Sequence, residues 1–117
     1  MQFISECHNF PDEKWQEVIS LNLSSSFYLT KYSLPSMLKN GWGRIINISS
    51  VHGLVASVNK SAYVAAKHGL VGFSRAIALE YAKKGITCNA VCPGWVLTPL
   101  IEKQIKIIME RDKLNFE

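Results

Sequence analysis

The chain has 117 residues, of which 48% are hydrophobic and 19% are charged, and its formal net charge at pH 7 is +4. This balance is typical of a soluble globular segment and argues against intrinsic disorder. No apolar run approaches the roughly 20 residues of a membrane span, and the N-terminus lacks a signal-peptide pattern, so we expect a cytoplasmic protein. The basic residues are scattered. This favours an ordinary basic surface over nucleic-acid binding, although the excess charge could also attract an anionic substrate or dinucleotide.

The three cysteines, Cys7, Cys88 and Cys92, form neither a disulfide pattern nor a metal-binding pattern. Their odd number is unusual for a disulfide framework. Cys88 and Cys92 fall on one expected strand, four residues apart, which separates them by about 13 Å, too far to share a metal ion. We therefore expect no metal site, and we interpret these two cysteines as buried thiols.

A long helix is expected over residues 12–39. Asp12 and Glu13 suit its N-terminus, and Gly41 suits the position just after its end. Pro35 should kink this helix or end its regular part.

The segment 44–49 is an almost continuous apolar run, which predicts a strand buried on both faces. Residues 51–59 indicate a loop, and residues 60–84 a second helix. Two glycines inside that helix, Gly69 and Gly72, lower its intrinsic stability and favour close packing against a neighbouring element.

Residues 86–92 predict another strand, which Pro93 and Gly94 break, and a final helix is expected over residues 98–109. A strand, a helix and a parallel strand form a right-handed crossover, so the fold class is α/β, a partial Rossmann-like doubly wound parallel sheet. Two strands alone leave a sheet edge unpaired. We therefore expect the isolated polypeptide to be poorly soluble or loosely folded.

Ser50, Tyr63 and Lys67 carry the clearest chemical signal. Tyr63 and Lys67 are four residues apart, which places both side chains on one face of a helix, one turn apart. A phenol exchanges protons poorly near neutral pH, and an ammonium group fixed beside it favours the phenolate. Ser50 follows the first expected strand, at the end where α/β sheets hold their ligands. Together the three residues suit proton transfer coupled to hydride transfer.

The segments 43–50 (GRIINISS), 63–67 (YVAAK) and 89–94 (NAVCPG) resemble the short-chain dehydrogenase/reductase family. The likeness extends from Met1 to about Ile108. Within the family it is strongest to D-3-hydroxybutyrate dehydrogenases. The resemblance implies an NAD-dependent oxidoreductase that interconverts 3-hydroxybutyrate and acetoacetate.

The resemblance also implies roles for individual residues. Tyr63 would be the general acid/base, and Ser50 would bind the substrate oxygen. Lys67 would bind the nicotinamide ribose, and Asn22 would hold a water that relays protons toward it. A packing hydrogen bond is the alternative role for Asn22. The expected catalytic residues are Asn22, Ser50, Tyr63 and Lys67, and the expected cofactor-binding residues are Asn22, Tyr63, Lys67, Pro93, Gly94, Val96 and Thr98.

A short hydroxy acid needs cationic and amide donors around its carboxylate. The resemblance supplies such donors, and Trp95 could add an apolar wall. The expected substrate-binding residues are Gln2, Ser50, His52, Lys60, Tyr63 and Gln104. Each polar residue could also be an ordinary surface residue. A hydrolase built on Ser50 and His52 is disfavoured because the sequence has no G-x-S-x-G turn.

The family's chains are longer single domains, and this sequence holds no glycine-rich turn for dinucleotide phosphates. We expect residues 1–117 to be one partial domain without the N-terminal glycine-rich half and the C-terminal strand. The chain could be part of a working 3-hydroxybutyrate dehydrogenase, an inactive relative that acts at most as an interaction module, or a dehydrogenase for another hydroxy or keto substrate. The resemblance implies a homo-dimer or tetramer through the two long helices. The choice between NAD and NADP stays open.

Overall fold

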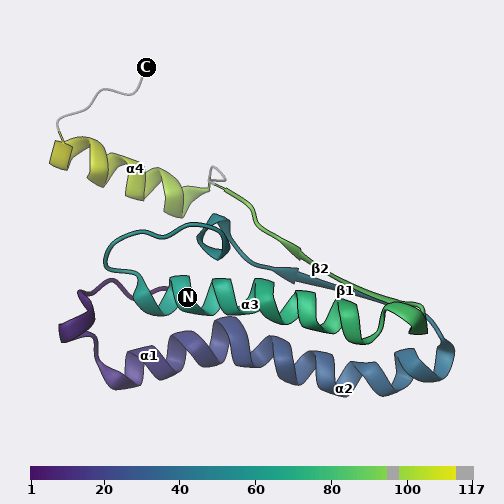
Figure 1. Cartoon of the computed structure of the whole chain (residues 1–117). Coiled ribbons are helices and arrows are strands. Elements are labelled where there is room, and N and C mark those ends of the chain that lie inside the picture. Colours follow the sequence, from purple (N-terminus) through teal and green to yellow (C-terminus); the bar gives the residue numbers. More distant parts are fainter. Residues whose placement is uncertain (95–97, 113–117) are drawn as a thin grey trace.

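The computed structural model describes residues 1–94 and 98–112. Its main elements are α1 (Asp12–Ile19), α2 (Ser25–Asn40), β1 (Gly43–Ile48), α3 (Ser61–Glu80), β2 (Ile86–Val91) and α4 (Pro99–Asp112). The two strands pair in parallel, with Gly43 opposite Ile86 and Ile48 opposite Val91. α3 connects the strands and packs against them, while α1 and α2 run beside it (Figure 1). This arrangement confirms the α/β class.

The expected long helix consists of α1 and α2 joined by a π-helical turn at Ser20–Ser24. α2 continues past Pro35 to Asn40, so Pro35 does not end it. The proline deprives only the carbonyl of Lys31 of its helical partner, and both residues lie on an exposed side of the helix where water can replace that bond. Gly41 follows the helix end with φ 66°, the left-handed conformation expected there.

The prediction that the first strand is buried on both faces is wrong. In β1, Gly43 is buried against Met37 of α2 and Asn47 is buried against Ser74 of α3, whereas Ile46 and Ile48 are 65% and 58% exposed. An apolar run indicates that a strand can be buried on both faces. In the described chain α2 and α3 cover one face of β1, and the face with Ile46 and Ile48 stays largely uncovered.

α3 ends at Glu80, four residues before the expected end. Close packing is expected at the two glycines of α3, and the structure shows it at Gly69 but not at Gly72. A Cβ on Gly69 would lie 2.9 Å from Cδ2 of Leu23, so the π-helical turn packs tightly there. A Cβ on Gly72 would meet no atom within 4 Å. Gly72 is exposed, and its expected packing is absent from the described chain.

The buried core lies between α3, the sheet and the helices beside it, and consists of Val18, Leu34, Ala62, Ala66, Leu70, Val71, Ile77, Ile86 and Cys88. Cys88 is buried as expected, but Cys92 follows β2 and is only half-buried. Among the described residues, no helix is both long enough and apolar enough to cross a membrane.

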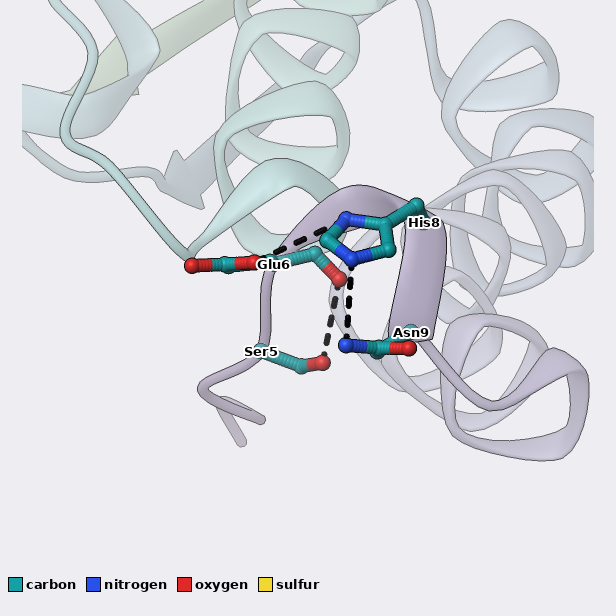
Figure 2. A network of polar contacts seen from close by, with 4 residues as sticks. All are labelled: Ser5, Glu6, His8 and Asn9. Atoms are coloured by element: carbon teal, nitrogen blue, oxygen red, sulfur yellow. Dashed lines mark hydrogen bonds and ion pairs between the residues drawn. The ribbon is translucent and has the colours of Figure 1, made fainter.

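The N-terminal segment is ordered by local polar contacts (Figure 2). The His8 ring lies between Asn9 and Glu6, with Nε2 3.2 Å from Asn9 Nδ2 and Nδ1 3.6 Å from Glu6 Oε2. Ser5 Oγ donates to the carbonyl of Glu6 at 3.1 Å. One backbone bond ties the segment to the rest of the fold, because Ser5 N–H donates to the carbonyl of Asn59 at 2.9 Å. The first residues therefore lie beside the loop that precedes α3.

Candidate active site

Ser50 lies directly beyond the carboxyl end of β1 and is buried. The parallel ladder continues on both sides of it, because Ser49 N–H donates to Val91 O at 2.7 Å and Val51 N–H donates to Pro93 O at 2.9 Å. Ser50 begins a tight helical turn, and its Oγ accepts the backbone N–H of His52 at 3.1 Å. The sheet thus fixes the position of this hydroxyl.

Tyr63 and Lys67 lie on the first turns of α3, on one face of the helix as the spacing predicts. Lys67 Nζ is 5.6 Å from the centre of the Tyr63 ring and donates to the carbonyl of Ile48 at 3.0 Å. Burial lowers the pKa of Lys67. The ammonium group therefore joins the end of β1 to the face of α3 that carries the phenol.

A second bond fixes α3 against the strand end. Ser49 Oγ donates to the carbonyl of Lys67 at 3.0 Å. A Cβ on Gly53 would lie 2.5 Å from Ser49 Oγ and 3.1 Å from that carbonyl, so the turn after Ser50 packs closely on both. These contacts set the separation of Ser50 from the first turns of α3.

His52 packs edge-to-face against Tyr63, with the ring centres 5.7 Å apart. Burial lowers the pKa of His52 below its ordinary value of 6.5, and the positive charges of Lys60 and His68 lower it further. The imidazole is therefore neutral at neutral pH and offers one donor and one acceptor nitrogen. Its Nε2 lies 2.7 Å from Oγ of Ser57.

A small cavity of about 110 Å³ opens where these elements meet. Residues from the N-terminal segment, the turn after β1, the start of α3, the segment after β2 and α4 line it. They are Gln2, Ser50, Val51, His52, Lys60, Tyr63, Gly94 and Gln104. Every residue that the sequence predicts for substrate binding therefore faces one cavity, together with two predicted cofactor positions, Tyr63 and Gly94.

Asn22 and Lys67 line a different and larger groove, of about 420 Å³, between α2 and β1. Asn22 sits in the π-helical turn, where its Nδ2 donates to the carbonyls of Met1 and Val18 at 2.9 and 3.0 Å. A π-helical turn often marks a functional position. Asn22 and Lys67 thus share a groove, as a proton relay between them requires, but Asn22 does not line the cavity at Ser50.

The remaining predicted cofactor positions are spread along the segment after β2. The carbonyl of Pro93 accepts the N–H of Val51, in the turn after Ser50, at 2.9 Å. Thr98 precedes α4, and its carbonyl accepts the N–H of Glu102 at 2.8 Å. Val96 and Trp95 lie outside the described residues. Among the described residues of this group, Gly94 is the one that lines the cavity.

Sequence reasoning missed two residues of this site. Val51 lines the cavity beside Ser50, and Ser57 contacts the imidazole of His52. Val51 could have been found, because it directly follows a predicted ligand-binding position. Ser57 lies in an irregular loop, where no periodicity shows which way a side chain points.

The family model of short chain dehydrogenases matches residues 2–107. The chain belongs to the short chain dehydrogenase family. Ser50 and Tyr63 of the family motif seen in the sequence line the cavity at the carboxyl ends of the parallel strands, and Lys67 lies one helical turn after Tyr63.

Three relatives within this family illustrate the similarity. The chain is 51% identical over 117 residues to D-beta-hydroxybutyrate dehydrogenase of Cupriavidus necator, which covers all of this chain and 45% of that protein. It is 58% identical over 105 residues to D-beta-hydroxybutyrate dehydrogenase of Rhizobium meliloti, 90% of this chain and 41% of that protein. It is 51% identical over 89 residues to cyclohexanol dehydrogenase of an Acinetobacter species, 76% of this chain and 36% of that protein. The chain thus spans less than half the length of each of these relatives.

Proposed function

We propose that this short chain dehydrogenase interconverts 3-hydroxybutyrate and acetoacetate with NAD. One observation carries the proposal: the hydroxyl of Ser50, the phenol of Tyr63 and four further polar side chains face a single cavity of about 110 Å³. Pockets for drug-sized ligands start at about 300 Å³, so this cavity suits a small substrate. The two D-beta-hydroxybutyrate dehydrogenases among the relatives support the same substrate.

In this proposal the residues of the cavity divide into two groups. Tyr63 exchanges a proton with the substrate oxygen, and Ser50 donates a hydrogen bond to that oxygen. The donors Gln2, Lys60 and Gln104 bind the carboxylate, and Lys60 contributes a full positive charge, whereas the neutral ring of His52 lines the cavity beside them and contacts Ser50. A neutral alcohol, such as that in the name of the Acinetobacter relative, would not need these donors.

The described residues fit the nicotinamide end of the cofactor, which supplies or accepts the hydride when bound. Lys67 Nζ carries three protons and gives one to Ile48 O, so two remain for ribose hydroxyls. Gly94 leaves room for a ligand, because a Cβ there would meet no atom within 4 Å. We propose that Asn22 passes protons toward Lys67 through water in their shared groove. Pro93, Val96 and Thr98 would lie along the same end of the cofactor.

The test is a fluorescence titration of the polypeptide with NADH, followed by an assay of acetoacetate reduction. Binding and turnover, with turnover lost in Tyr63→Phe, would support the proposal. Tyr32→Phe is a matched control, because Tyr32 is 73% exposed on α2 and should leave the rate unchanged. Full activity in Tyr63→Phe would overturn the proposal. Failure of this polypeptide to bind NADH at millimolar concentration, with activity in the complete natural protein, would assign the function to the longer chain alone.

We also propose that a second copy of the chain packs against α2 and α3. An apolar groove of about 400 Å³ runs between these helices, and Phe27 and Phe73 meet in it edge-to-face with ring centres 6.3 Å apart. Phe27 is 45% exposed, and other large apolar residues of α2, such as Leu29 and Leu38, are exposed as well. An exposed apolar patch of this kind favours a homo-oligomer.

A further inference from the structure

The imidazole of His52 is held at both ring nitrogens. Nε2 lies 2.7 Å from Oγ of Ser57, whereas Nδ1 lies 3.5 Å from Oγ of Ser50. The first separation is that of a strong hydrogen bond, and the second is at the outer limit for one. Ser57 is therefore the stronger determinant of how this ring is oriented.

Ser57 belongs to the exposed loop before α3, but two backbone bonds hold that loop in place. Val55 N–H donates to Val51 O at 3.0 Å, and Asn59 O accepts the N–H of Ser5 at 2.9 Å. Because the backbone is fixed on both sides of Ser57, its hydroxyl can hold the imidazole at a small cost in conformational entropy.

The hydrogen-bond capacity of Ser50 shows why the orientation matters. A serine hydroxyl has one proton and two acceptor positions. Oγ of Ser50 already accepts the backbone N–H of His52 at 3.1 Å. If Nδ1 carries the ring proton, Oγ can accept a second bond, and its own proton stays available to a ligand in the cavity. If Nδ1 has no proton, it competes with that ligand for the proton of Ser50.

We propose that Ser57 is a positioning residue: its hydroxyl donates to Nε2 of His52, places the ring proton on Nδ1 and so frees the proton of Ser50 for the substrate oxygen. The neutral ring has one proton to place, so a donor at one nitrogen decides the tautomer. The inference rests on the proposed function, in which Ser50 binds the substrate oxygen.

The first test measures the tautomer without substrate. The nitrogen chemical shifts of His52 are recorded in the complete natural protein labelled with ¹⁵N-histidine, and His52→Gln assigns the signals. We expect a protonated Nδ1 and an unprotonated Nε2 in the wild type and in Ser57→Thr, which keeps the hydroxyl. We expect the two shifts to move toward each other in Ser57→Ala. Val58→Ala is the loop control, since Val58 is 83% exposed. Unchanged shifts in Ser57→Ala would overturn the proposal.

The second test compares the reduction of acetoacetate with that of its neutral ethyl ester. Because Ser57 acts through Ser50 and not through the carboxylate, Ser57→Ala should lower kcat for both by about threefold to tenfold. Ser57→Thr and Val58→Ala should stay near the wild-type rate. A loss confined to acetoacetate and seen in KM alone would contradict the proposed route through Ser50. If the tautomer depends on Ser57 but the wild type reduces neither compound, the role of Ser57 in orienting the ring is supported and the proposed function fails.

Discussion

The ammonium Nζ of Lys67 lies 5.6 Å from the centre of the Tyr63 ring while donating to the carbonyl of Ile48 at 3.0 Å. The lysine is therefore anchored by the backbone of the last residue of β1. Burial lowers the pKa of Lys67, since the charged form loses part of its hydration. An ammonium group that is partly desolvated acts more strongly on a neighbouring phenol than one in bulk water.

Lys67→Met should reduce turnover of the complete natural protein by about 100-fold or more, because the positive charge beside the phenol and the donors proposed for the ribose are lost. The measurement is the steady-state rate of acetoacetate reduction. The chain offers a matched control in Lys31, whose Nζ lies 5.4 Å from the ring centre of Tyr32 on exposed α2. Lys31→Met should keep the wild-type rate, and equal losses in the two variants would contradict the special role of Lys67.

His52 should make stability depend on pH. Because its pKa is lowered below 6.5 in the folded state, the unfolded chain binds a proton more readily than the folded chain. The free energy of unfolding therefore rises with pH up to about 6.5 and declines below it. Thermal melting of wild type and His52→Gln between about pH 5 and about pH 7 checks this, and the variant should lose less stability on acidification.

A substitution at Lys60 tests why the pKa of His52 is lowered. Its positive charge is the second cause of the lowered pKa of His52, after burial. Lys60→Met should therefore weaken the acid dependence without abolishing it. An identical pH dependence in wild type, Lys60→Met and His52→Gln would show that His52 does not control it.

Much of the site could be predicted because its residues sit at positions that local patterns define. Ser50 follows a strand, and Tyr63 and Lys67 share a helical face, so periodicity alone brings the last two together. Gln2 and Gln104 are different: they come from opposite ends of the chain, and the family resemblance, not periodicity, placed them at the cavity.

Three features of the structure were not predicted, because each depends on tertiary contacts that local sequence patterns do not define. An apolar run shows that both faces of a strand can be buried, but it does not show which elements cover them. For this reason the sequence did not predict that Ile46 and Ile48 are exposed. The π-helical turn at Ser20–Ser24 changes the helical register by tertiary packing, in part against Gly69. The bond from Ser57 to His52 depends on the path of an irregular loop.

Gly53→Ala should destabilise the protein and lower turnover together. The added Cβ would lie 2.5 Å from Oγ of Ser49 and 2.9 Å from Cγ2 of Val71, so these side chains or the backbone that carries them must shift. We expect a loss of about 1–3 kcal/mol in the free energy of unfolding, as for other overpacked sites. Gly72→Ala is the control in open space on α3 and should raise stability by about 0.5–1 kcal/mol. Denaturant unfolding distinguishes the two, and a neutral Gly53→Ala would refute the close packing.

Asn59 has φ 63°, the left-handed conformation, and its carbonyl accepts the N–H of Ser5 at 2.9 Å. Asn59→Gly should preserve this conformation, whereas Asn59→Val should cost about 1–2 kcal/mol, because a β-branched residue disfavours it. Because the Ser5 bond ties the N-terminal segment that carries Gln2 to this loop, we expect the valine variant also to raise KM for acetoacetate more than the glycine variant does. Equal KM values would show that the position of Gln2 does not depend on this bond.

Phe73→Asp should dissociate the proposed homo-oligomer. The ring of Phe73 lines the groove between α2 and α3, where it meets Phe27 edge-to-face. A carboxylate there would be desolvated by a second copy of the chain, and an unpaired charge in an apolar interface is strongly unfavourable. Sedimentation of the complete natural protein should show a lower mass for Phe73→Asp, while Val58→Asp, at a loop position 83% exposed, should keep the wild-type mass. If Phe73→Asp stays folded and keeps its mass, the subunits associate through another surface.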